Sequence, residues 1–189
     1  MTTIDAATAR DIPAIMRLER GDGFEHLVGR WSAEQHAAEM VVPGSHYLVA
    51  RRSHEVAGFV MLQQIDDPNG CVHLRRIAVS HPGAGLGAVL LDAALAHAFA
   101  NASTHRVQLR VFPDNERALR AYRRIGFVEE GLLRDVVRAP DGRRRSMLMF
   151  SILRPEWEVV AAIGASCPYD EGSCEAEALL QPAVRPLGG

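Results

Sequence analysis

The stretch of sequence that decides the fold runs from residue 115 to residue 127. It reads Asn115-Glu116-Arg117-Ala118-Leu119-Arg120-Ala121-Tyr122-Arg123-Arg124-Ile125-Gly126-Phe127. The spacing predicts a helix over residues 116–125 that ends at Gly126, the usual residue for a left-handed stop. Ala118, Tyr122 and Ile125 then share one face of this helix. A tyrosine on that face can fill the core, or it can present its hydroxyl to a ligand.

A glycine-rich turn precedes this helix, separated from it by one predicted helix and one predicted strand. It reads Pro82-Gly83-Ala84-Gly85-Leu86-Gly87. Glycines let backbone N–H groups approach a ligand closely, and the first N–H groups of a helix have no internal partner. The turn therefore predicts a diphosphate site, with a turn that binds no ligand as the alternative. A dinucleotide site is disfavoured because Gly-x-Gly-x-x-Gly needs its third glycine one position later.

Turn residues and apolar periodicity divide the rest of the chain into hairpins, a βαβα segment and a final hairpin. Strands are expected over residues 46–52, 56–64, 71–79, 105–112, 127–137 and 145–153, after a short first strand near Ile4. Helices are expected from about residue 9, over 32–40, over 86–101 and over 116–125. This mixture of hairpins and one parallel pair predicts an α+β domain.

Composition narrows the class of protein. The chain has 189 residues, 48% of them hydrophobic, with a net charge of −2, which gives no sign of nucleic-acid binding. It shows neither an apolar run of about 20 residues nor a signal peptide, so we expect a cytoplasmic protein without membrane association. Cys71, Cys167 and Cys174 predict neither a disulfide framework nor a metal site. One domain over 1–157 and a loosely ordered, acidic Ala/Pro/Gly-rich tail over 158–189 are expected.

Both motifs resemble those of the GNAT superfamily of N-acetyltransferases. Gly85 and Gly87 match the family's Arg/Gln-x-x-Gly-x-Gly/Ala loop, in which Pro82 replaces the usual Arg or Gln. Residues 115–127 resemble the second half of the family's domain. The resemblance implies a V-shaped mixed sheet of about seven strands with about four helices. The sheet would splay between the fourth strand, 72–79, and the fifth, 106–112.

The resemblance also implies a site for acetyl-CoA as cosubstrate, without a metal. The backbone of the fourth strand would bind pantetheine, and the glycine turn would bind the diphosphate. The strand residues are Ile77, Ala78 and Val79, and the turn residues are Gly83, Ala84, Gly85, Leu86 and Gly87. Asn115 would face the cofactor or cap its helix. Tyr122 would donate a proton to the departing thiolate, because a phenol can donate to a thiolate that it contacts.

The general base is less evident, although an amine with a pKa near 10 must lose a proton before it attacks a thioester. The fourth strand carries His73 but no acid, and alternation along a strand predicts that His73 shares a face with Ile77 and Val79. The segment between the first two helices holds three rivals. These are Glu19, Glu25 and His26. In the family this segment usually lines the acceptor side, so the resemblance implies that Glu19, Glu25 and His26 would also bind the acceptor. Phe24 and Trp31 of the same segment could line its pocket.

The function predicted by these residues is acetyl transfer from acetyl-CoA to a primary amine. The acceptor could be a small amine, an amino acid or the N-terminus of a peptide or protein, and the enzyme could be a monomer or a homodimer. An arginine cluster near the last turn could bind an acceptor carboxylate, or it could be a solvated hairpin. Its members are Arg134, Arg138, Arg143, Arg144 and Arg145. A catalytically weak acyl-CoA-binding module is the alternative function.

Overall fold

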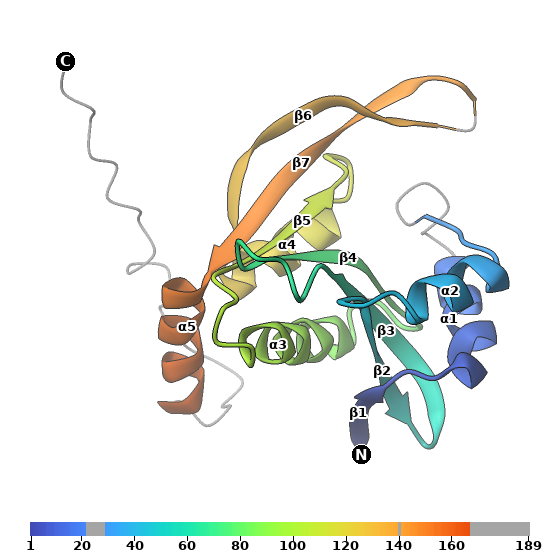
Figure 1. Ribbon diagram of the computed structural model, residues 1–189, viewed down its shortest axis with the longest axis horizontal. Coiled ribbons are helices and arrows are strands. Elements are labelled where there is room, and N and C mark those ends of the chain that lie inside the picture. Colours follow the sequence, from blue (N-terminus) through green and yellow to red (C-terminus); the bar gives the residue numbers. More distant parts are fainter. Residues whose placement is uncertain (22–28, 140, 167–189) are drawn as a thin grey trace.

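The computed structural model describes residues 1–21, 29–139 and 141–166. Its centre is a seven-stranded sheet with the strand order β1-β2-β3-β4-β5-β7-β6 (Figure 1). The strands are β1 (Thr2–Ala6), β2 (His46–Arg52), β3 (Glu55–Gln63), β4 (Cys71–Val79), β5 (Arg106–Val111), β6 (Val128–Arg138) and β7 (Arg144–Leu153). The β4–β5 pair is parallel, and its neighbours in the sheet pair antiparallel.

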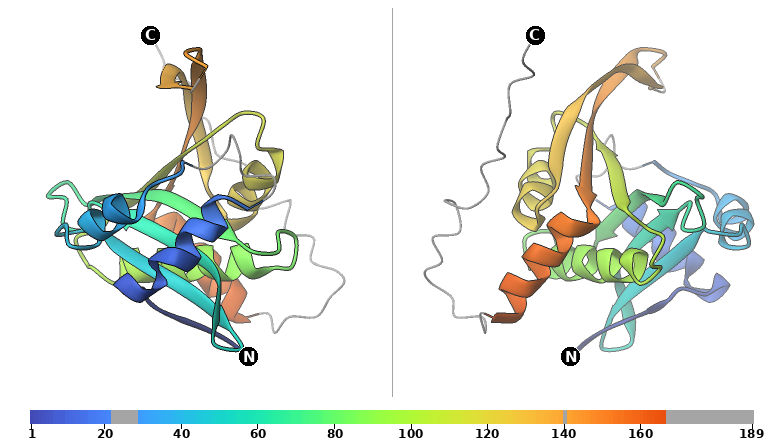
Figure 2. Two further views of the ribbon diagram at one scale, coloured as in Figure 1. Left: turned by 90° about the vertical axis from the view of Figure 1, so that its right-hand side faces the viewer. Right: turned by 60° about the vertical axis from the view of Figure 1, so that its left-hand side comes forward.

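Helices cover both faces of the sheet and enclose two hydrophobic clusters. The larger cluster joins the sheet to α3 (Leu86–Phe99) and α4 (Glu116–Ile125). The smaller cluster joins the other face to α1 (Ile12–Glu19), which follows the short helix η1 (Ala9–Asp11), and to α2 (Ala33–Met40). Figure 2 places α1 and α3 on opposite sides of the sheet, with the β6–β7 hairpin projecting away from the helices.

The predicted α+β class and mixed seven-stranded sheet are confirmed, and several local boundaries agree with the sequence signals. Both β2 and β4 have the predicted bounds. Gly126 ends α4 with a φ of +100°, as a left-handed stop requires. The helix α2 begins with a capping box, in which Gln35 N donates to Ser32 Oγ at 3.3 Å and Ser32 N donates to Gln35 Oε1 at 2.9 Å.

Helix α5 (Arg154–Ser166) crosses the predicted boundary between residues 157 and 158. It docks because Trp157 stacks on Phe99 of α3, with ring centroids 4.9 Å apart. The Arg154 guanidinium also donates to the carbonyls of Phe99, Asn101 and Thr104 at 2.7–2.9 Å. These contacts satisfy acceptors at and beyond the C-terminal end of α3. The helix itself continues to Ser166, past residue 157.

The sheet is open in its middle. Parallel pairing of β4 with β5 runs from Cys71 and Arg106 to Leu74 and Leu109 and then stops, although β4 continues to Val79. The other edge of β4 stays paired with β3 as far as Val79. Backbone groups on the β5 side of residues 75–79 therefore have no partner strand, which is the splay that the sequence predicted.

Candidate functional site

The glycine turn lies directly after the open part of β4 and leads into α3. Gly83 and Gly85 have φ values of +91° and +78°, which residues with a Cβ rarely adopt. A Cβ placed on Gly83, Gly85 or Gly87 would meet no protein atom within 4 Å. The space beside these glycines is open, and the start of α3 turns unpaired N–H groups toward its N-terminal end. An anionic group such as a diphosphate fits this environment.

Within the turn, the contribution of single residues differs. Gly85 is the N-terminal cap of α3, and its carbonyl accepts from Ala88 N at 3.1 Å. Ala84 N points at the carbonyl of His81 at 3.5 Å, so this N–H is partly engaged inside the turn. Leu86 is buried in the main cluster, so its side chain anchors the helix start while its backbone stays at the turn.

Tyr122 lies on the buried face of α4, where its side chain is 7% exposed. Its ring centroid is 5.7 Å from that of Phe127 and 6.4 Å from that of Phe150. Burial raises the pKa of Tyr122 to about 12, so the phenol keeps its proton at neutral pH. The ring therefore packs in the core, which agrees with the first interpretation of this residue. Donation of the phenol proton to a ligand stays a prediction.

Asn115 caps α4, as the sequence predicted. Its Oδ1 accepts a hydrogen bond from Ala118 N at 3.2 Å. This bond holds the side chain at the start of the helix that carries Tyr122. A direct contact between Asn115 and a cofactor stays a prediction.

The face on which His73 lies was predicted wrongly. Met61 of β3 pairs with Arg76 and Leu62 pairs with Leu74, so Arg75 is an extra residue at a β-bulge. Val72 and Leu74 lie in the cluster under α3, and Ile77 and Val79 pack against that same cluster. The bulge reverses the alternation, so His73 lies on the opposite face of the sheet from Ile77 and Val79.

His73 is also a weak candidate for the base on electrostatic grounds. Burial and the positive charges of Arg75 and Arg110 lower the pKa of His73 to about 4. The imidazole is therefore neutral at physiological pH, but it is a poor match for a proton from an ammonium group with a pKa near 10. A role for His73 through an intervening water stays a prediction.

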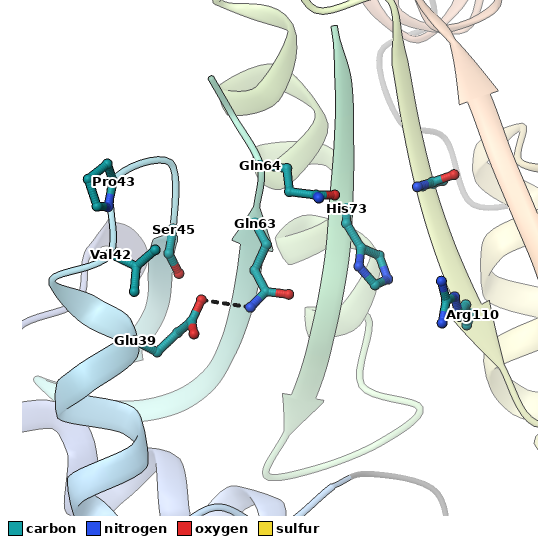
Figure 3. Close-up of a pocket in the computed structure, with 9 residues that line it drawn as sticks. Glu39, Val42, Pro43, Ser45, Gln63, Gln64, His73 and Arg110 are labelled. Carbon is teal, nitrogen blue, oxygen red and sulfur yellow. Dashed lines mark hydrogen bonds between the residues drawn. The ribbon is translucent and has the colours of Figure 1, made fainter. Parts of the chain in front are cut away.

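His73 lines a pocket of about 520 Å³ on the α2 side of the sheet, next to the point where β4 and β5 separate (Figure 3). The residues that line it are Glu39, Val42, Pro43, Ser45, Gln63, Gln64, His73, Gln108 and Arg110. Gln63 Nε2 donates to Glu39 Oε1 at 2.6 Å on one side of His73 (Figure 3). Sequence reasoning missed Glu39, Gln108 and Arg110, although alternating polar residues along β5 were a usable signal.

The loop residues predicted to bind the acceptor have different surroundings. Phe24, Glu25 and His26 lie outside the described residues. The Glu19 side chain is 0% exposed, and its Oε1 accepts from Arg76 Nη1 at 2.6 Å. Its Oε2 lies 3.3 Å from His36 Nε2 and accepts from Trp31 N at 3.1 Å.

These contacts make Glu19 an anchor inside the fold. Burial favours its protonated form, but the hydrogen bonds of His36 and of Trp31 N, together with the Arg76 charge, hold the pKa of Glu19 below its ordinary value. Arg20 Nη2 donates to the Trp31 carbonyl at 3.0 Å, and the Arg76 guanidinium stacks 4.1 Å from the Trp31 ring. Both ends of the segment from Arg20 to Trp31 are thus held against α1 and β4.

The hairpin arginines are partly engaged within the protein. Arg143 pairs with Asp141 at 2.8 Å, and Arg145 pairs with Asp114 at 2.7 Å. Arg144 Nη1 donates to the Asp135 carbonyl at 3.4 Å. These contacts leave fewer of the arginines available for an acceptor carboxylate than the sequence suggested.

Residues 1–21, 29–139 and 141–166 contain no cluster of three or more His, Cys, Asp or Glu side chains that could hold a metal ion. None of the described helices combines the length and apolarity needed to cross a membrane.

Comparison with curated proteins gives two informative relatives. An uncharacterized N-acetyltransferase p20 of Bacillus licheniformis is 27% identical over 111 residues, which are 58% of this chain and 62% of that protein. A spermidine N(1)-acetyltransferase of Vibrio cholerae is 39% identical over 57 residues, which are 30% of this chain and 33% of that protein. Each match therefore spans less than two thirds of the relative.

Solved structures share the fold over most of the chain. The spermidine N-acetyltransferase of Vibrio cholerae, in complex with CoA and spermine, has a TM-score of 0.72 at 22% identity and covers 83% of this chain and 98% of its own. The ribosomal-protein-S18-alanine N-acetyltransferase of Escherichia coli has a TM-score of 0.67 at 22% identity and covers 81% of this chain and 94% of its own.

The family assignment rests on the sequence model of the acetyltransferase (GNAT) family, which matches residues 12–127. The match begins at α1 and ends just after α4, so it includes the open edge of β4, the glycine turn and Tyr122. The chain belongs to the acetyltransferase (GNAT) family.

Proposed function

We propose that this protein transfers the acetyl group of acetyl-CoA to a primary amine. The observation that carries the proposal is the loss of β4–β5 pairing after Leu74 and Leu109, which leaves an unpaired strand edge that leads directly to the glycine turn. An extended chain with amide groups can pair with such an edge, and a diphosphate fits the turn that follows. Pantetheine and the diphosphate of CoA are joined in that order.

The residues at this site would divide the work as follows. Backbone groups of Ile77, Ala78 and Val79 bind the pantetheine amides, and the turn from Gly83 to Gly87 binds the diphosphate. The ammonium group of the acceptor first loses a proton to a base or water, and the neutral amine nitrogen then attacks the thioester carbon. The tetrahedral intermediate loses a second proton from its nitrogen to a base or water, and its carbon–sulfur bond breaks to release the thiolate. The raised pKa of Tyr122 keeps its phenol protonated, and Tyr122 gives this proton to the departing thiolate.

The known relatives support an amine acceptor without defining it. One structural neighbour is a spermidine N-acetyltransferase, and another is a ribosomal-protein-S18-alanine N-acetyltransferase. Both names describe acetylation of an amine, although one is a polyamine and the other a protein residue. A cytoplasmic enzyme that acts as a monomer or homodimer is consistent with this proposal.

A catalytically weak acyl-CoA-binding module is the second candidate. The observations that favour it are Pro82 in the turn, the absence of an acidic residue on β4, and the low pKa of His73. Such a module would bind acetyl-CoA through the same edge and turn without turning over an amine.

The Tyr122→Phe substitution separates the two candidates. We expect acetyl-CoA to raise the Tm of the unmodified protein and of the Tyr122→Phe variant equally, because the variant retains the aromatic ring and the core packing. We expect thiol release with an accepted amine to fall about 100-fold or more, which is the usual contribution of a positioned acid. Binding of acetyl-CoA without turnover of any amine by the unmodified protein would support the module and reject the enzyme.

A further inference from the structure

Two arginines stand at the point where the sheet opens. His73 pairs with Gln108 and Leu74 with Leu109, so Arg75 and Arg110 occupy the first position after the last parallel pair. Both side chains are exposed, and Arg110 lines the pocket beside His73. Among the hydrogen bonds and ion pairs of residues 1–21, 29–139 and 141–166, neither guanidinium has a partner. Figure 3 shows Arg110 on the far side of His73 from Glu39.

The charges around these arginines are unbalanced. Arg75 is exposed but partly shielded from water, and this partial desolvation lowers its pKa. The charges of Arg76 and Arg110 lower the pKa further, whereas the charge of Glu39 acts in the opposite direction. Arg76 is neutralised by Glu19, but Glu39 is hydrogen-bonded by Gln63 on the other side of the pocket. Glu39 supplies one negative charge for two guanidinium groups that repel each other, and a further anion stabilises such an environment.

The position of the pair separates this anion from the diphosphate of the cofactor. From Arg75, β4 continues to Val79, which is about 13 Å at the rise of a strand, before the glycine turn begins. The pocket also opens on the α2 side of the sheet, whereas α3 lies on the other face. An acceptor that enters through this pocket would meet the arginine pair before it reaches the thioester.

We propose that Arg75 and Arg110 bind a carboxylate of the acceptor, so that the substrate is an amino acid or a short peptide and not a polyamine. This inference rests on the proposed acetyl transfer. Two planar guanidinium forks suit a carboxylate because each can donate two parallel hydrogen bonds. A polyamine carries only positive charges and would be repelled by the same pair.

The test compares acceptors that differ only in this charge. Amino acids and alanyl dipeptides are assayed with acetyl-CoA beside their C-terminal carboxamides, with spermidine and phosphoethanolamine as further acceptors. We expect the free carboxylates to have KM values about 10- to 100-fold lower than the carboxamides, as for one or two charge-assisted hydrogen bonds. Equal KM values, or a preference for spermidine or phosphoethanolamine, would overturn the inference.

Substitutions then locate the effect on the two arginines. Arg75→Gln and Arg110→Gln should each raise the KM of the carboxylate acceptor by about 10-fold or more and leave the KM of the carboxamide unchanged. The KM of acetyl-CoA should not change, since its phosphates bind elsewhere. The exposed Arg10 supplies a matched control, because Arg10→Gln removes the same charge from η1, which does not line the pocket. A rise in the KM of acetyl-CoA alone would assign the pair to the cofactor and refute the inference.

Binding without turnover keeps this inference distinct from the proposed function. Alanylalanine and its carboxamide are titrated into the CoA-loaded protein while the imidazole signals of His73 are followed by NMR. A bound carboxylate should raise the pKa of His73 in the unmodified protein but not in the Arg110→Gln variant. Carboxylate binding without acetylation of any amine would reject the proposed function alone. Acetylation of amines without selective carboxylate binding would reject this inference alone.

Discussion

Breaking the buried ion pair between Glu19 and Arg76 is expected to destabilise the protein strongly. The two side chains are 0% and 5% exposed, and Arg76 Nη1 lies 2.6 Å from Glu19 Oε1. Glu19→Gln removes the negative charge but keeps the shape of the side chain, which leaves the Arg76 guanidinium buried without its counter-charge. Breaking a buried pair in this way costs about 3 to 5 kcal/mol.

The surroundings point to the lower end of that range. Glutamine at position 19 keeps one acceptor oxygen, which can accept either from Trp31 N or from Arg76 Nη1, and Arg76 keeps its stacking contact with the Trp31 ring. A loss of about 3 kcal/mol lowers the Tm of a domain of this size by roughly 6 to 12 °C. Urea unfolding followed by circular dichroism measures the free energy, and a thermal scan of the same samples measures the Tm.

An exposed ion pair supplies the control. Glu116 and Arg120 on α4 lie 3.4 Å apart, with side chains 80% and 71% exposed. Glu116→Gln makes the same chemical change and should cost no more than about 0.5 kcal/mol, because water screens an exposed pair. If Glu19→Gln lowers the free energy of unfolding no more than Glu116→Gln does, then burial does not make the loss of a counter-charge more costly, and the reasoning is refuted.

Replacing both partners tests the cause of the loss. In the double variant Glu19→Leu with Arg76→Met, no charge is left buried without a partner. We expect this protein to be more stable than the Glu19→Gln variant, since apolar pairs of similar volume commonly replace buried ion pairs without loss. A double variant that is less stable than Glu19→Gln would show that packing, and not the unpaired charge, dominates.

Three further predictions concern pH, the glycine turn and His73. The pKa of Glu19 in the folded protein lies below its ordinary value of 4.5, so ionised Glu19 should stabilise the fold fully above pH 4.5 and lose this effect as the pH falls through the folded-state pKa. In an acid titration, the free energy of unfolding of Glu19→Gln should therefore fall less than that of the unmodified protein. Gly85→Ala and Gly142→Ala should each cost about 1 to 2 kcal/mol, since both glycines have positive φ and open surroundings, but kinetics should show a raised KM for acetyl-CoA only for Gly85→Ala. The pKa of His73 is about 4, so its titration should give no inflection near pH 6.5 in the pH profile of kcat/KM. His73→Asn should therefore leave the shape of the profile between pH 5 and 8 unchanged. An inflection in this range that the substitution abolishes would contradict the low pKa of His73.

Local signals predicted a large part of the domain because they depend on neighbours in sequence. Asn115 and Gly126 mark the limits of α4 since a cap and a left-handed stop are properties of single residues and their adjacent N–H groups. The turns around β2 and β4 are local in the same way. The glycine turn was recognisable for the same reason, although its open surroundings were not.

The remaining features depend on contacts between distant residues. Helix α5 was not predicted, because its docking needs Phe99 of α3 and carbonyls near the end of α3. Glu19 was predicted as a possible acceptor residue because its partner Arg76 lies far away in the sequence. No periodicity within either segment indicates such a pairing.

The sequence by itself determined the order of elements, the α4 segment with Tyr122 and the glycine turn before α3, because caps, stops and turns are encoded within a few residues. Only the tertiary structure decided which groups meet at the opening of the sheet. The bulge at Arg75 forms because Met61 and Leu62 of β3 pair with Arg76 and Leu74, and this pairing moves His73 to the other face. The register of β4 with β5, which ends at Leu74 and Leu109, places Arg75 and Arg110 at the same level of the sheet, since the position of a side chain on a sheet depends on the strand next to it.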